Sequence, residues 1–191
     1  MNSSFIKRKL YCIGMNKIFS TKERIKILNS IILNKNLLSV NAIASNLKLS
    51  KGFVSLYFGI LKKNGIIKKV NEKYQIIDSG MIRAIRILLT ITNIDISIFK
   101  KYSFVKSAGL YGSCAKGENT EKSDMDVWVK INDVGDEKIA SLTTEINKKI
   151  KKAKPLFLTE RKLEKIKKDD ELFYHSLAFG SIILYGEKNA I

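Results

Sequence analysis

The sequence has a single proline, a single histidine and two cysteines among 191 residues. With so little proline, the chain lacks the composition of a disordered or linker-rich protein. Cys12 and Cys114 lie far apart without CxxC spacing, which argues against a disulfide framework and against a cysteine zinc site. His175 is a lone imidazole without the cluster of cysteine, histidine or carboxylate ligands that a metal site needs, so we interpret it as a structural residue.

Long apolar segments are also missing. No run approaches the roughly 18 apolar residues that a membrane span needs. No apolar stretch follows the basic residues Lys7, Arg8 and Lys9, as it does in a secretory signal. We therefore expect a cytoplasmic protein without a membrane partner.

Acidic residues are scarce. The chain has 35 Lys and Arg but only 18 Asp and Glu, which gives a net charge of +17. The excess is uneven: residues 1–95 carry 17 basic and 4 acidic residues, whereas residues 96–191 carry 18 and 14. A basic half joined to a nearly balanced half indicates two domains with different partners. The basic half favours a polyanion such as nucleic acid, but a solvated basic surface explains the same charge.

Residues 18–78 carry three helix signals followed by a hairpin signal. Apolar residues at helical spacing follow hydroxyl or amide residues that can cap a helix, namely Ser20, Ser39 or Asn41, and Ser50. Ser20 also has Glu23 at the spacing of a capping box. Two β-prone runs, at 66–70 and 74–77, then predict a β-hairpin.

This order of elements resembles a winged helix-turn-helix domain, and residues 49–55 and 61–67 are similar to the recognition helix and wing entry of prokaryotic regulators. The resemblance implies that the third helix enters the major groove of DNA while the wing contacts phosphates. The expected contact residues are Lys51, Ser55, Tyr57, Lys68, Lys69 and Lys73. Phe53, Leu56 and Ile60 lie on the same helix face, however, and favour a protein contact instead.

The second half begins with a predicted strand at 105–111, which leads into Gly112 and Ser113. A second predicted strand at 124–131 places Asp124 and Asp126 on one face, because alternate residues of a strand point the same way. Paired carboxylates suit Mg²⁺, which also takes phosphate oxygens as ligands. A glycine at a strand end permits close backbone approach to a phosphate.

A Gly-Ser turn followed after ten residues by Asp-x-Asp resembles the minimal nucleotidyltransferases of polymerase-β type, a group that includes protein adenylyltransferases and antitoxins. Residues 115–117 and 180–187 are similar to further family motifs. The resemblance implies a small mixed sheet with flanking helices that binds ATP or another nucleoside triphosphate with two Mg²⁺ ions. It assigns nucleotide binding to Gly112, Ser113 and Lys116, and both metal binding and catalysis to Asp124 and Asp126.

Members of this family usually add a third carboxylate on a later strand. In the matching segment, 154–160, Leu156 stands where that carboxylate is expected, and Glu160 shares its strand parity. The third metal ligand is therefore missing, displaced to Glu160, or supplied elsewhere. The lysines at 148–154 lead into this segment. They form either a solvated face at a helix end or a groove for an acceptor.

The predicted fold class is α+β, with an arm at 1–17, a winged helix-turn-helix at 18–78, a connecting helix at 79–94 and a nucleotidyltransferase domain at 95–191. The first functional hypothesis is Mg²⁺-dependent transfer of AMP from ATP to a protein hydroxyl, in the setting of an antitoxin with a helical toxin-like partner. The alternative is a DNA-binding transcriptional regulator with a degenerate or nucleotide-sensing transferase domain. The sequence leaves open the oligomeric state, the acceptor and the DNA site.

Overall fold

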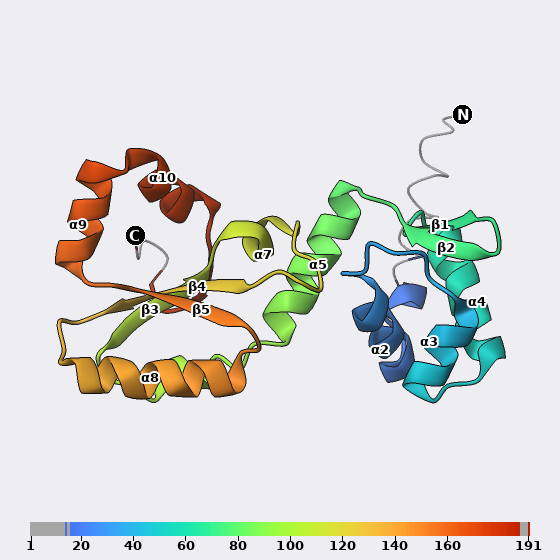
Figure 1. Ribbon diagram of the computed structural model, residues 1–191, viewed down its shortest axis with the longest axis horizontal. Helices are drawn as coiled ribbons and strands as arrows, with labels where there is room; N and C mark the ends of the chain where they lie inside the picture. The colour runs from blue at the N-terminus through green and yellow to red at the C-terminus, as the bar shows by residue number, and fades with distance from the viewer. Residues whose placement is uncertain (1–13, 15, 188–190) are drawn as a thin grey trace. The chain divides into compact units, whose positions relative to one another are not determined.

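The computed structural model describes residues 14, 16–187 and 191. The chain divides into two compact units, Met1–Ile82 and Arg83–Ile191. Both contain helices and strands, so the predicted α+β class is confirmed (Figure 1). The division lies inside helix α5 (Gly80–Thr92), which corresponds to the expected connecting helix at 79–94. Most of the predicted arm at 1–17 lies outside the described residues.

Unit 1 contains helices α2 (Lys22–Ile31), α3 (Val40–Leu47) and α4 (Lys51–Lys63). Ser39 and Ser50 are the N-cap residues of α3 and α4, as the sequence predicts. The N-cap of α2 is Thr21 and not Ser20, because the Thr21 hydroxyl accepts the hydrogen bond from the Arg24 backbone N–H. No helix in the described part of the chain is long and apolar enough to cross a membrane.

The predicted hairpin is the antiparallel pair β1 (Ile67–Val70) and β2 (Lys73–Ile76). Leu38 adds a short bridge to it through backbone hydrogen bonds with Tyr74 in both directions. Phe58 of α4 packs edge-on against the Tyr74 ring, with the ring centroids 5.0 Å apart. These contacts attach the hairpin to the helices and complete a winged helix-turn-helix arrangement.

The position of Tyr57 corrects one expectation from the sequence. Its side chain is fully buried, and its hydroxyl donates a hydrogen bond of 3.0 Å to the Ile18 carbonyl. Burial also raises the pKa of the Tyr57 phenol far above its usual range. Tyr57 therefore belongs to the core of unit 1 and not to the face that carries Lys51 and Ser55. Leu56, by contrast, is 73% exposed on that face.

Unit 2 is built on a four-stranded mixed sheet with the strand order β5-β4-β3-β6. Its strands are β3 (Val105–Leu110), β4 (Met125–Ile131), β5 (Ala153–Leu158) and β6 (Ile182–Tyr185). β3 pairs antiparallel with β4 and β6, whereas β4 and β5 are parallel. Its helices after α5 are α6 (Ser97–Lys100), α7 (Gly112–Lys116), α8 (Asp136–Lys149), α9 (Glu160–Asp169) and α10 (Glu171–Gly180).

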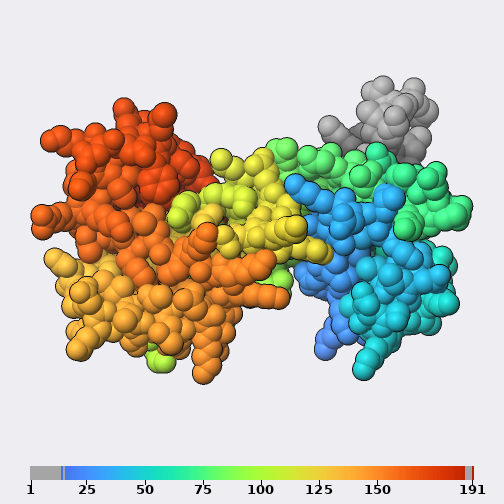
Figure 2. Space-filling view, viewed as in Figure 1, coloured from blue at the N-terminus to red at the C-terminus, as the bar shows by residue number. Residues whose placement is uncertain are grey.

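Each face of this sheet has its own apolar cluster. Val127 and Val129 of β4 pack with Leu142 and Ile146 of α8 on one face. Trp128, the residue between the two valines, points to the other face and packs with residues of β5, α9 and α10: Leu158, Leu163 and Leu177. Figure 1 shows α8 on one side of the sheet and α9 with α10, in orange-red to red, on the other, and the atoms of these segments lie at opposite edges of unit 2 in Figure 2.

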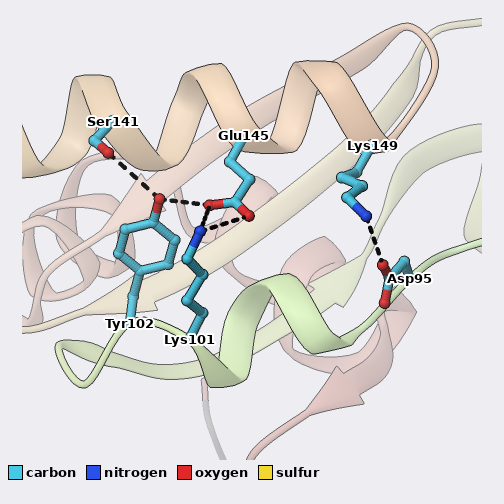
Figure 3. Close-up of polar contacts among 6 residues, drawn as sticks. All are labelled: Asp95, Lys101, Tyr102, Ser141, Glu145 and Lys149. Atoms are coloured by element: carbon cyan, nitrogen blue, oxygen red, sulfur yellow. Dashed lines mark hydrogen bonds and ion pairs between the residues drawn. The ribbon is translucent and has the colours of Figure 1, made fainter.

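Polar contacts tie α8 to the segment around α6 (Figure 3). Glu145 accepts a hydrogen bond of 2.7 Å from the Tyr102 hydroxyl and pairs with the Lys101 ammonium at 2.9 Å. These two partners hold the pKa of Glu145 below its usual value. Lys149 pairs with Asp95 at 3.3 Å. This side of unit 2 is therefore occupied by structural contacts.

We expect Tyr57→Phe to lower the free energy of unfolding by about 1 kcal/mol, because it removes a buried hydrogen bond and leaves the Ile18 carbonyl without its partner. Urea unfolding of the full chain followed by circular dichroism measures the change. Ser55→Ala, on the exposed side of the same helix, is the matched control and should shift stability by less than about 0.5 kcal/mol. Equal stability of Tyr57→Phe and the wild type would contradict the buried hydrogen bond to Ile18.

Candidate nucleotide and metal site

The site begins where β3 ends. The Tyr111 backbone N–H donates a hydrogen bond of 3.1 Å to the Asp126 carbonyl, so the end of β3 is joined to the start of β4. Gly112 follows with a φ of +65°, a left-handed conformation that strongly favours glycine, and opens helix α7. Gly117, with a φ of +68°, ends this helix. Two glycines therefore set both ends of the turn that carries Ser113.

Gly112 and Asp126 are in close contact. A Cβ atom built on Gly112 would lie 2.7 Å from the Asp126 Oδ2 atom, closer than real Cβ atoms approach a neighbour. Two features therefore favour glycine at position 112: its left-handed backbone angle and the space occupied by the Asp126 carboxylate. The structure brings together the Gly-Ser turn and the Asp-x-Asp strand that the sequence analysis paired.

Asp124 precedes β4 and Asp126 lies within it, both half-buried. The neighbouring strand supplies a lysine to the pair. β5 runs parallel to β4 in a register that places Lys154 beside Asp126, and the Lys154 Nζ lies 2.5 Å from the Asp124 Oδ2. The site is therefore two carboxylates and one ammonium group at the edge of the Gly112 turn.

The ionisation of these groups follows from their surroundings. Burial raises the pKa of the Asp126 carboxyl, the Lys154 ammonium opposes this shift, and the Asp124 carboxylate adds to it. Hydrogen bonding and attraction to Asp124 raise the pKa of Lys154, which keeps it charged. Burial raises the pKa of the Cys114 thiol to about 11, so this cysteine of α7 is a protonated packing residue and not a nucleophile.

Comparison with known families assigns this unit. The model of the family described as polymerase beta, nucleotidyltransferase, matches residues 94–190, just over half of the chain. The chain belongs to this nucleotidyltransferase family. The crystal structure of NolR from Sinorhizobium fredii is similar at 19% identity and a TM-score of 0.35, over 47% of this chain and 91% of that one. No curated protein matches the sequence.

In unit 2, helix α5 holds the loop that follows α7. The Arg86 guanidinium donates to the Gly117 carbonyl at 3.3 Å, and Arg83 pairs with Glu118 at 3.3 Å. The Asn119 amide donates to the Thr90 hydroxyl at 3.5 Å. Three consecutive loop residues are therefore attached to one helix, which steadies the chain between the Gly112 turn and Asp124.

Glu160 does not join the site of Asp124 and Asp126. It is the first residue of α9 rather than a strand residue, and its carboxylate pairs with Lys130 at 2.9 Å. Lys130 lies four residues beyond Asp126, about 13 Å along the strand. Leu156 is in register with Trp128 and faces the apolar cluster. Among the residues that the structure describes, no group of three His, Cys, Asp or Glu side chains could hold a metal ion.

Lys154 is the site residue that sequence reasoning missed. The sequence places it in a basic run at a helix end, but α8 ends at Lys149 and Lys154 lies on β5. The signal was present in the alternation of the segment, since Lys154 has the same strand parity as Leu156 and Glu160. What the sequence did not contain was the register between two parallel strands.

The remaining predicted residues take surface positions. Lys116 is exposed at the last position of α7, and Ser113 is half-buried one residue after Gly112. In unit 1, the predicted DNA-contacting residues other than Tyr57 are exposed: Lys51, Ser55, Lys68, Lys69 and Lys73. Of these, Lys69 pairs with Glu72 at 3.4 Å.

We expect Gly112→Ala to lower the free energy of unfolding of this unit by about 1–2 kcal/mol, because the left-handed backbone and the Asp126 contact both oppose a Cβ atom. The fluorescence of Trp128, the single tryptophan, reports the transition during urea unfolding. Gly180→Ala is the control, since its Cβ would meet nothing within 4 Å. A stability loss no larger than that of the control would contradict the close approach.

Proposed function

We propose that unit 2 binds a nucleoside triphosphate with Mg²⁺ and transfers its nucleotidyl group, with AMP from ATP as the leading case, to a hydroxyl group of a protein. The observation that carries this proposal is the contact of the Gly112 turn with the carboxylate of Asp126, with Asp124 beside it. The membership of the nucleotidyltransferase family supports the reaction class.

The side chains present suit one Mg²⁺ ion. Asp124 and Asp126 offer carboxylate oxygens, and Mg²⁺ is commonly bound by one or two carboxylates together with substrate phosphates. When bound, the ion would supply charge stabilisation for the phosphate oxygens. A second ion lacks ligands, because no third carboxylate accompanies the pair among the described residues.

In the proposed reaction, the acceptor hydroxyl oxygen forms a bond to the α-phosphorus of ATP. The bond from that phosphorus to the oxygen bridging to the β-phosphate breaks, and pyrophosphate leaves with its electron pair. The hydroxyl proton passes to water. Gly112 and Ser113 would hold phosphate oxygens through backbone N–H and hydroxyl groups, and Lys116 would neutralise their charge.

A protein acceptor is favoured by the surface of α10. Leu172 and Phe179 are 84% and 83% exposed and lie seven residues apart, with His175 between them on the same helix face. Exposed apolar side chains gathered on one helix face are typical of protein contacts. The resemblance to minimal nucleotidyltransferases extends the proposal to a helical toxin-like partner, for which this chain would be the antitoxin.

The double substitution Asp124→Asn and Asp126→Asn is expected to abolish nucleotidyl transfer, because it removes both anionic ligands of the metal while keeping their size. The full chain is incubated with α-³²P-ATP and Mg²⁺, alone and with host lysate, and labelled macromolecules are separated. Thermal unfolding of the variant controls for folding.

Label on a discrete protein that disappears in the double variant supports transfer and identifies the acceptor. Label that persists in the variant would remove the proposed metal site. Nucleotide binding without label, under any nucleotide or metal, favours the alternative function.

That alternative is a DNA-binding regulator whose unit 2 senses a nucleotide without transferring it. Two observations favour it: the ion pair of Lys154 with Asp124, and the row of exposed lysines on the wing at 68–73. The two functions are compatible, since a winged helix can bind DNA through Lys51 and Ser55 of α4 and through wing lysines, whichever reaction unit 2 performs.

If the wing contacts DNA phosphates, replacing Lys68 and Lys73 by alanine should reduce the slope of log Kobs against log salt by about 2. Fluorescence anisotropy of the full chain with duplex DNA at several salt concentrations measures this slope. Lys138→Ala with Lys148→Ala, exposed residues of α8, removes the same charge and should leave the slope unchanged. A flat salt response of the wild type would point to a protein contact at unit 1.

A further inference from the structure

The residue beside Asp126 on the next strand is a cation. Parallel pairing places Lys154 in register with Asp126, and residues paired in this way point to the same face of a sheet. The Lys154 ammonium reaches the Asp124 carboxylate at 2.5 Å. Two other lysines of these strands and their flanks are held elsewhere: Lys152 donates to the Glu121 carbonyl at 2.7 Å, and Lys130 pairs with Glu160.

The ligands of this cluster limit how many divalent ions it can hold. Two ionised carboxylates and one ammonium group carry a net charge of −1, and Lys154 already pairs with Asp124. One divalent ion has the carboxylates of Asp124 and Asp126 as ligands. A second divalent ion would have no further carboxylate to bind it, since the described residues contain no third ligand at the site.

We propose that Lys154 takes the place of one of the two divalent ions of a nucleotidyl-transfer site, so that unit 2 binds a nucleoside triphosphate with a single divalent ion. This inference rests on the function proposed above. Lys154 thereby determines how many divalent ions the site binds, because its ammonium group compensates the charge of Asp124.

The exposure of the pair agrees with such a role. The side chains of Lys154 and Asp124 are 66% and 45% exposed, so solvent screens their attraction. A weak, exposed ion pair can open when a triphosphate and its ion arrive. The flexible lysine stem then lets the ammonium group stay near the phosphates without breaking the strand.

The number of bound metal ions tests the proposal directly. The full-length protein is saturated with an ATP analogue that has a methylene group between the α- and β-phosphates. Bound Mn²⁺ is then counted by electron paramagnetic resonance. We expect one Mn²⁺ per chain for the wild type and two for Lys154→Asp, which places a third carboxylate in register with Asp126. Lys154→Met should keep one ion and bind it about fivefold more tightly, because a competing cation is gone.

Lys151→Asp and Lys151→Met are the matched controls, since Lys151 is an exposed lysine of the same basic run. Both should behave as the wild type. Lys154→Met also guards against misfolding of Lys154→Asp, because it removes the charge without adding a carboxylate.

Two Mn²⁺ ions bound to the wild type together with the analogue would overturn the role of Lys154 and leave the proposed function standing. Equal Mn²⁺ affinity in Lys154→Met and the wild type would overturn it as well. Failure of the wild type to bind the analogue at all, with or without Mn²⁺, would instead overturn the proposed function, and the inference with it.

Discussion

Hydrogen bonding between β4 and β5 in parallel register places Asp126 beside Lys154, and the charge of the site depends on that pairing. A shift of two residues would put Leu156 beside Asp126 and leave the two carboxylates without a neighbouring lysine. A shift of one residue would turn the lysine to the face that α8 covers, because side-chain direction alternates along a strand. The register is held by the apolar residues of both faces, so the chemistry of the site is determined by packing that lies outside it.

Close backbone approach is the second constraint on this site. Gly112 lies against the Asp126 carboxylate, and Gly117 lies so near the Arg83 backbone that a Cβ atom would come within 2.3 Å of its carbonyl oxygen. The first contact joins the turn to β4, and the second joins the end of α7 to α5. Contacts from Arg86 and Thr90 then extend the attachment of α5 along the loop. The turn and loop beside the carboxylates are consequently fixed by contacts with β4 and with α5.

Nucleotidyl transfer would require more of this site than nucleotide binding does. In the proposed function, the carboxylate pair, the glycine turn and the exposed Lys116 would all act on a triphosphate and its ion. Activation of an acceptor hydroxyl would also need a base or a second ion, and the position beside Asp126 on β5 holds Lys154 instead. The two proposed functions, a slow transferase and a nucleotide-sensing domain, would therefore share one binding site and differ in how Lys154 affects the acceptor.

Local sequence signals sufficed for the three helices and the hairpin of unit 1 and for strands β3 and β4 of unit 2. The caps at Ser39 and Ser50, the hairpin and these two strands were predictable because capping, turn formation and strand alternation act within a few residues. Glu160, expected on a strand, begins helix α9 instead. The association of the Gly-Ser turn with the Asp-x-Asp strand was implied by the resemblance to nucleotidyltransferases, and the close contact of Gly112 with Asp126 came from the structure. The burial of Tyr57 was not, because the helix spacing alone does not say how far the core of unit 1 extends around α4.

The sequence by itself determined that this is an α+β chain with a basic winged helix-turn-helix and a Gly-Ser, Asp-x-Asp nucleotidyltransferase domain. Only the tertiary structure decided that Glu160 lies at the far end of the strands and that Lys154 lies at the carboxylates. The reason is that motifs are local in the chain, whereas the neighbour of a strand residue depends on the register between strands. That register follows from the packing of the whole sheet against α8 on one face and α9 with α10 on the other.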